Sequence, residues 1–166
     1  MINEGAAWAI LFLPLSSFLL ISLFIRPFWN QFEKFSGYIT ILAIGATFVL
    51  SSWALWSVYR HGGELGWVGH PWISTGNLEI SLGILMDPLT AIMLVVVSGV
   101  SLLVQIYSQG YMRGDTGYSR YFAYMSLFTA SMLGLVLARN IIQLYVFWEL
   151  VGLSSYLLIG FWYHRP

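Results

Sequence analysis

The sequence predicts an all-α integral membrane protein with five transmembrane helices. Only 8% of its 166 residues are charged, whereas 58% are hydrophobic and 17% are aromatic. A soluble domain carries roughly 25% charged residues, so this chain has too few to cover a water-exposed surface. The charged residues also separate long apolar segments of about 20 residues, the length that crosses a ~30 Å hydrocarbon layer as a helix.

The first two apolar segments are residues 6–25 and 38–59. Arg26 closes the first and Arg60 closes the second. A secretory signal peptide would begin with basic residues and contain a shorter apolar core. Because the first segment is preceded by Glu4 and no basic residue, we predict that it remains in the protein as a helix.

Three further segments complete the predicted bundle: residues 88–108, 121–138 and 141–163. Asp87 and Pro88 come where the first of these begins. Asp caps free backbone amides and Pro fits the first helical position, so this pair predicts a helix start at the membrane border.

The one long connection, residues 64–86, predicts a short β-hairpin. Hydrophobic residues alternate with Glu79, Ser81 and Gly83, which is the period-two pattern of a strand. The cluster 75–77 (Thr-Gly-Asn) predicts the turn before this strand. With no internal repeat or linker, residues 1–166 are expected to form a single transmembrane bundle.

The distribution of basic residues predicts the orientation in the membrane. Five lie after the odd-numbered segments and two after the even-numbered ones: Arg26, Lys34, Arg113, Arg120 and Arg165 against Arg60 and Arg139. Basic residues favour the cytoplasmic side or its organellar equivalent. We therefore expect the N-terminus outside and the C-terminus inside, in a bacterial plasma membrane, a thylakoid membrane or a mitochondrial inner membrane.

Composition and motifs argue against several classes of function. The net charge is zero, which gives no electrostatic footprint for nucleic acid. The chain has no cysteine, so it can hold no disulfide, thiolate zinc site or iron–sulfur cluster. The three histidines lie between or beyond the apolar segments, which disfavours haem ligation within the bilayer. We expect no cofactor and no metal in this chain.

Glu149 is the candidate functional residue. It lies eight residues after Ile141, roughly 12 Å into a segment that otherwise lacks charge. An acidic side chain at such depth costs about 2.5–3.5 kcal/mol to insert. Hydrocarbon disfavours the charged form of a carboxyl group, so Glu149 is expected to gain and lose a proton as its surroundings change. The alternative is a neutral acid that only hydrogen-bonds neighbouring helices.

Two sets of polar residues are candidates to support Glu149. At about 100° per residue, Tyr145 and Tyr156 share its helical stripe, together with glycines that would let another helix approach. Ser98, Ser101 and Gln105 form a polar stripe on the third segment. Such residues bridge helices as often as they line a hydrated path.

Two stretches of the sequence resemble a known family. Residues 117–166 and 86–112 are similar to the largest antiporter-like subunit of respiratory complex I and its photosynthetic relatives, called subunit 5, L or F. The most specific stretch is FWELVGLSSYLLIGFWY, residues 147–163. The resemblance covers nearly the whole chain.

The resemblance implies proton translocation driven by electron transfer from NAD(P)H or ferredoxin to a quinone. Glu149 matches the essential glutamate of the family's fifth helix. No redox chemistry is expected in this chain; flavin, iron–sulfur clusters and quinone are expected in partner subunits.

Members of the family have fourteen or more helices, and a lysine on the seventh works with this glutamate. The only lysine here, Lys34, lies between the first two segments. We therefore expect this chain to be the N-terminal piece of a longer subunit or one part of a split subunit.

Two other functions stay open. The same module occurs in cation/proton antiporters, membrane-bound hydrogenases and inorganic-carbon uptake complexes. The sequence WELVG around Glu149, where Mrp-type antiporters are expected to have a variation of WELTS, favours the respiratory type. In a purely structural subunit, Glu149 would only join helices.

Overall fold

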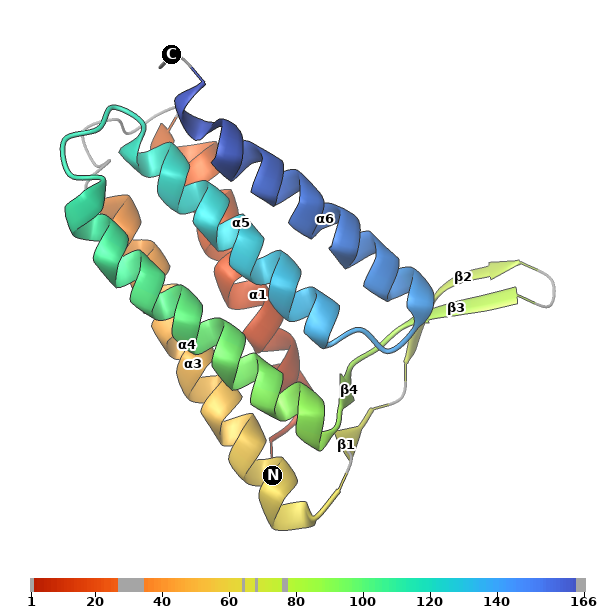
Figure 1. Ribbon diagram of the computed structural model, residues 1–166. Helices are drawn as coiled ribbons and strands as arrows, with labels where there is room; N and C mark the ends of the chain where they lie inside the picture. Colours follow the sequence, from red (N-terminus) through yellow and green to blue (C-terminus); the bar gives the residue numbers. More distant parts are fainter. Residues whose placement is uncertain (1, 27–34, 64, 68, 76–77, 164–166) are drawn as a thin grey trace.

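The computed structural model describes residues 2–26, 35–63, 65–67, 69–75 and 78–163. Within these ranges five helices lie side by side in one bundle, with short strands at one end (Figure 1). The predicted all-α architecture, with five helices and a short hairpin between the second and the third, is confirmed.

The first two helices each begin a few residues before the apolar segments that predict them. Helix α1 (Glu4–Leu20) begins at Asn3, whose side-chain oxygen accepts a hydrogen bond from the Ala6 amide at 2.9 Å. A π-helical turn, η1 (Ile21–Ile25), continues it. Helix α3 (Phe35–His61) returns along the bundle to the end where α1 begins.

The connection between α3 and α4 contains two small antiparallel sheets. Its strands are β1 (Leu65–Gly66), β2 (His70–Thr75), β3 (Leu78–Leu82) and β4 (Leu85–Met86). Strands β2 and β3 form the predicted hairpin, with His70 opposite Leu82. The predicted turn residues 76–77 lie outside the described residues. Strands β1 and β4 pair closer to the bundle.

Helix α4 (Pro88–Tyr111) begins where the Asp-Pro pair predicts. The Thr90 amide donates to Asp87 Oδ1 at 2.6 Å. This hydrogen bond from the Thr90 backbone is the main reason why the pKa of Asp87 lies below its usual value. Asp87 is therefore a charged cap at neutral pH.

Helices α5 (Tyr118–Val136) and α6 (Ile141–Ile159) complete the bundle, and α6 ends in the 3₁₀ turn η3 (Gly160–Trp162). Helix α5 starts and ends slightly earlier than the predicted segment 121–138. As a result Arg120, which we expected just outside the helix, lies in its first turn.

The hairpin is held to the start of α6 by side-chain hydrogen bonds. Asn140 caps α6 by accepting a hydrogen bond from the Gln143 amide at 2.8 Å. Its side-chain nitrogen donates to the Ser81 carbonyl at 2.5 Å. Gln143 in turn accepts from the Gly83 amide at 3.3 Å. These contacts fix the first turn of α6 against the connection between α3 and α4.

The interior changes character along the bundle. Near the strands it is an apolar cluster from four helices (α1, α3, α4 and α5) and the segments beside them: Ile2, Ala7, Ile10, Leu11, Ala54, Val58, Ile84, Met86, Ala91, Leu94, Leu133 and Leu137. From mid-bundle toward the other end, pairs of hydroxyl groups join the helices: Ser17–Ser126, Ser36–Ser119, Ser101–Thr129 and Ser108–Tyr121. The second region offers polar groups inside a membrane bundle.

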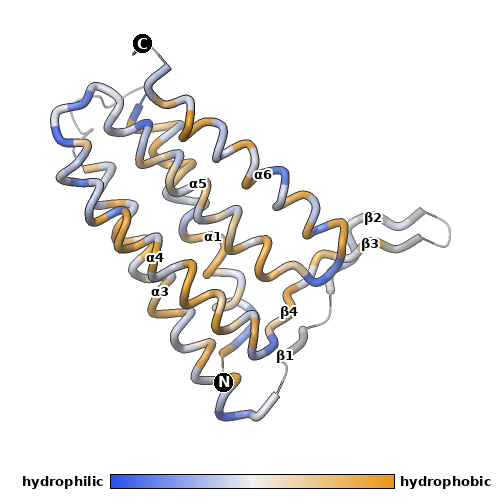
Figure 2. Tube along the Cα trace, in the orientation of Figure 1, coloured by the Kyte–Doolittle hydropathy of each residue, from blue (hydrophilic) through white to orange (hydrophobic). Residues whose placement is uncertain are grey.

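Four of the described helices are long and apolar enough to cross a membrane: Glu4–Ile25, Phe35–His61, Pro88–Tyr111 and Ile141–Trp162. Hydrophobic residues dominate their middle parts in Figure 2. Helix α5 is less hydrophobic, yet it contacts all four other helices. A helix surrounded by protein needs fewer apolar residues than one that faces lipid, which explains how α5 fits among spanning helices. The chain is an integral multi-pass membrane protein.

Candidate functional site

The site is built on α6, which packs mainly against α5. The contact is close because α5 carries Gly134 there. A Cβ atom at Gly134 would lie 2.3–2.6 Å from the ring atoms of Phe147. Phe147 thus fixes one face of α6 to the bundle and turns the opposite face outward.

Glu149 lies in the middle of α6, and its side chain is exposed in this chain. Among the acidic residues that the structure describes, it is the only one inside a helix and away from the helix ends. The Tyr145 side chain, one turn earlier, lies close enough to interact with the Glu149 carboxyl group. Trp148 is 64% exposed and Leu153 is 50% exposed. The carboxyl group is therefore surrounded by apolar surface, with one tyrosine hydroxyl group nearby.

The predicted stripe around Glu149 points away from the bundle. Tyr145 is 62% exposed and Tyr156 is 72% exposed. A Cβ atom at Gly152 or Gly160 would meet no other atom within 4 Å. The stripe is thus an open surface in the described part of the chain.

The second set of predicted residues occupies a different place. Ser98, Ser101 and Gln105 are buried in α4. The Ser101 hydroxyl lies 2.5 Å from that of Thr129 on α5, and the Ser98 hydroxyl donates to the Leu94 carbonyl at 2.6 Å. Helix α5 packs against α4 and against α6. The structure therefore joins Tyr145 to Glu149 and leaves the α4 residues in another interface.

Arg120 is a neighbour of α6 that the sequence analysis missed. Its guanidinium donates to the Phe161 carbonyl at 3.3 Å and lies 4.8 Å from the centre of the Phe161 ring. A cavity of about 410 Å³ beside it is also lined by Tyr124 and Tyr156. The only signal for Arg120 in the sequence was its place directly beside an apolar segment. In the structure Arg120 is a cation close to the stripe, toward the C-terminal end of α6.

No group of three His, Asp, Glu or Cys side chains that could hold a metal ion occurs among the described residues. What the α6 site offers is a carboxyl group, tyrosine hydroxyls and an open helix face. The carboxyl and hydroxyl groups can bind and pass a proton, since each can accept or donate a hydrogen bond.

Two family models match the chain. Residues 72–122 match "NADH-Ubiquinone oxidoreductase (complex I), chain 5 N-terminus". Residues 138–166, which include Glu149, match "NADH:quinone oxidoreductase/Mrp antiporter, TM".

Similar curated proteins agree along almost the whole chain. The subunit 5 of NAD(P)H-quinone oxidoreductase from the chloroplast of Mesostigma viride is 47% identical over 163 residues, which are 96% of this chain and 25% of that protein. The chain 5 protein of Synechocystis sp. is 43% identical over 163 residues, 96% of this chain and 24% of that protein. This chain belongs to the subunit 5 family. It corresponds to the N-terminal portion of such subunits and spans about a quarter of their length.

A solved structure has the same fold. The chain superposes with a TM-score of 0.69 on a chain of the membrane-bound sulfane sulfur reductase, an archaeal respiratory membrane complex. The match covers 93% of this chain and 30% of the other, at 20% sequence identity. This similarity supports the helical arrangement of the antiporter-like module.

Proposed function

We propose that this chain carries part of a proton path in a proton-pumping NAD(P)H:quinone oxidoreductase, and that Glu149 is the group that carries the proton. The observation behind the proposal is the position of Glu149. Its carboxyl group lies in the middle of an apolar helix long enough to cross a membrane, on a face of α6 that the described helices leave uncovered. Acidic residues inside a membrane segment generally face a bundle interior or a water-filled cavity.

The open stripe of α6 suits a covering helix. Gly152 and Gly160 have free space above them, and glycines at four- or eight-residue spacing let helices approach closely. The relatives are about four times as long as this chain. We infer that their later helices cover the stripe and supply the lysine that the family resemblance implies.

Tyr145 and Tyr156 have supporting roles in this proposal. Tyr145 lies one turn from Glu149 and close enough to interact with it, so its hydroxyl group is placed to relay a proton to the carboxyl group. Tyr156 lies about two turns further along α6 and lines the cavity beside Arg120. It would extend the path toward the C-terminal end of the helix.

Electron transfer takes place elsewhere in such a complex. The partners are other membrane subunits and redox subunits that hold flavin, iron–sulfur clusters and quinone, with NAD(P)H or ferredoxin as the electron donor. The photosynthetic relatives favour a thylakoid or related membrane.

The proposed orientation places the hairpin outside and the α4–α5 connection inside. Ser74 and Thr116 are exposed on these two connections. Ser74→Cys should react with an impermeant thiol reagent from the outside, and Thr116→Cys from the inside. The reverse labelling pattern would overturn the orientation.

The test of the function is Glu149→Gln in the full-length subunit within its complex. Glutamine keeps the size and much of the hydrogen bonding of glutamate but cannot release a proton. We expect proton pumping, followed with a pH-sensitive dye in sealed vesicles, to fall strongly while the complex still assembles. Glu149→Asp should keep part of the activity.

Glu4→Gln is a matched control. Glu4 lies at the start of α1 and pairs with His70 at 3.0 Å on the surface, so its substitution should leave pumping unchanged. Full pumping by the Glu149→Gln complex would refute the proton-carrying role and favour a structural one.

A cation/proton antiporter is the second candidate. The family model that matches residues 138–166 covers Mrp antiporters as well as oxidoreductases, and membrane-bound hydrogenases and carbon-uptake complexes share the module. Purification of the native complex separates the classes. Flavin and iron–sulfur subunits that copurify support the oxidoreductase, whereas sodium-dependent proton exchange without them supports the antiporter.

A further inference from the structure

Gln105 is a buried amide without a hydrogen-bond partner. Its side chain is 0% exposed, and among the described residues neither its oxygen nor its nitrogen is hydrogen-bonded. It lies in α4, within a span apolar enough to cross the membrane. The amide can make several hydrogen bonds, and the described side chains satisfy none of them.

The surroundings of Gln105 are polar on both sides along the helix. One turn earlier, Ser101 pairs with Thr129 at 2.5 Å, and about one turn later Ser108 pairs with Tyr121 at 3.1 Å. Both pairs join α4 to α5, so Gln105 faces the same interface between them. Met125 lies midway between Tyr121 and Thr129 on α5.

Leaving an amide unsatisfied inside a membrane protein is costly, because no lipid group can replace the lost hydrogen bonds. Buried polar groups of this kind are usually satisfied by ordered water. A water molecule needs two to four polar partners. The amide of Gln105 and the hydroxyl groups one turn away on either side are of the right kind and close enough along the helix.

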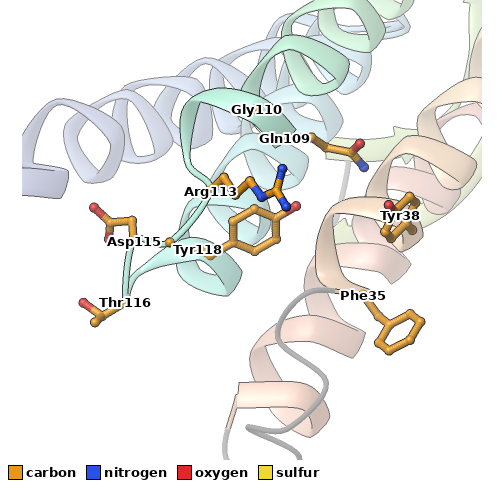
Figure 3. A pocket seen from close by; sticks show the side chains of 9 residues that line it. Phe35, Tyr38, Gln109, Gly110, Arg113, Asp115, Thr116 and Tyr118 are labelled. Atoms are coloured by element: carbon orange, nitrogen blue, oxygen red, sulfur yellow. The ribbon is translucent and has the colours of Figure 1, made fainter.

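A cavity shows where such water can enter. It has a volume of about 860 Å³ and lies at the α4–α5 connection, lined by Gln109, Arg113 and Tyr118 among others (Figure 3). The Gln109 side-chain nitrogen is buried and has no hydrogen-bond partner in the described part of the chain. Gln109 is one helical turn from Gln105 on the same face of α4. It therefore stands between the cavity and the buried amide.

We propose that Gln105 and Gln109 bind ordered water in a hydrated inlet that runs from this cavity into the α4–α5 interface. The inlet is separate from the open stripe that carries Glu149, since that stripe points away from the bundle. It is a water site in its own right and does not depend on Glu149 carrying protons.

The test is radiolytic footprinting of the full-length subunit in its native membrane complex. In this method the radicals form from the water molecules where they are bound. A buried methionine is therefore oxidised quickly only if water is bound next to it. We expect Met125 to be oxidised much faster than Met86, which is 0% exposed and belongs to the apolar cluster. Gln105→Leu should reduce oxidation of Met125 to the level of Met86.

Gln109→Leu should slow the oxidation of Met125 by narrowing the inlet, and Glu149→Gln should leave it unchanged. As a measurement without substitutions, a cryo-EM map of the complex should show water density at hydrogen-bond distance from the Gln105 amide. Equal oxidation of Met125 and Met86 in the unmodified complex, or a map with no such density, would overturn the inlet. Loss of pumping in Glu149→Gln would bear on the proposed function alone.

Discussion

Helices α5 and α6 have the same length but opposite surroundings. Each has 19 residues. Helix α5 is the less hydrophobic of the two and contacts every other helix, whereas α6 is highly apolar and packs mainly against α5. A highly apolar helix in a membrane protein thus indicates contact with lipid or with a further helix. A moderately polar helix indicates a position at the centre of the bundle.

The glycines of the two helices show the same difference. Gly134 on α5 and Gly117, which caps the start of α5, each lie against an aromatic ring. A Cβ atom added at either glycine would be closer than van der Waals contact to the ring of Phe147 on α6 or of Phe161 in η3. Gly152 in α6 and Gly160 directly after it face empty space. Helix α5 thus uses its glycines within this chain, and those of α6 are free for another helix.

The largest expected effect concerns function without the covering helix. Residues 1–166 reconstituted alone in liposomes should conduct no protons above empty liposomes, because a path needs polar groups that reach both membrane faces. Internal pH is followed under an imposed potential, with circular dichroism to verify helix content. A proton flux that Glu149→Gln abolishes would show that α6 needs no cover.

A paired glycine substitution tests the packing difference. Gly134→Ala should destabilise the chain by about 1–3 kcal/mol, since its Cβ atom would overlap the Phe147 ring. Gly152→Ala should stabilise it by up to about 1 kcal/mol through helix propensity. Thermal unfolding in detergent micelles measures both.

Gly152 should respond differently to substitution in the full-length subunit. There a larger side chain, Gly152→Leu, is expected to hinder assembly, because the proposed covering helix would occupy the space above Gly152. Normal assembly of that variant would show that the stripe faces lipid.

A smaller effect is expected from the hydroxyl pair at the α4–α5 interface. Ser101→Ala or Thr129→Val should each destabilise the chain by about 1 kcal/mol, and the double variant should cost less than the sum, since both lose one shared hydrogen bond. A double-mutant cycle by thermal unfolding measures this coupling. Purely additive losses would mean that the 2.5 Å contact contributes nothing.

The smallest effect compares two helix caps. The folded-state pKa of Asp87 is lowered, so its contribution to stability is present above the unfolded value of 3.8 and is lost as pH falls through the folded value. Asn140, the cap of α6, is uncharged, so its contribution to stability does not depend on pH.

Asp87→Asn should therefore remove about 0.3–1 kcal/mol of the stability gained between acid and neutral pH. Asn140→Ala should lower stability by a similar amount at every pH. Melting curves between acid and neutral pH compare the two variants. A pH-independent loss in Asp87→Asn would show that the charge of this cap does not matter.

Much of this protein was predictable from the sequence because it depends on local chemistry in lipid. The apolar segments gave the helices, the alternation in residues 78–84 gave a strand, and Asp87 marked a helix start. Glu149 stands out as a candidate from the sequence alone, because one carboxyl group in an apolar segment is costly wherever the segment packs. These features need no knowledge of neighbours.

Only the tertiary structure decided which surface each stripe meets. The period of a helix shows that Tyr145, Glu149 and Tyr156 share a face, but in a segment that is apolar all round it does not show where that face points. The position of Phe147 against Gly134 turned it outward. Likewise, burial against α5 separated Ser101 and Gln105 from Glu149, because packing between helices is set by side-chain shape, which a hydrophobic pattern does not contain.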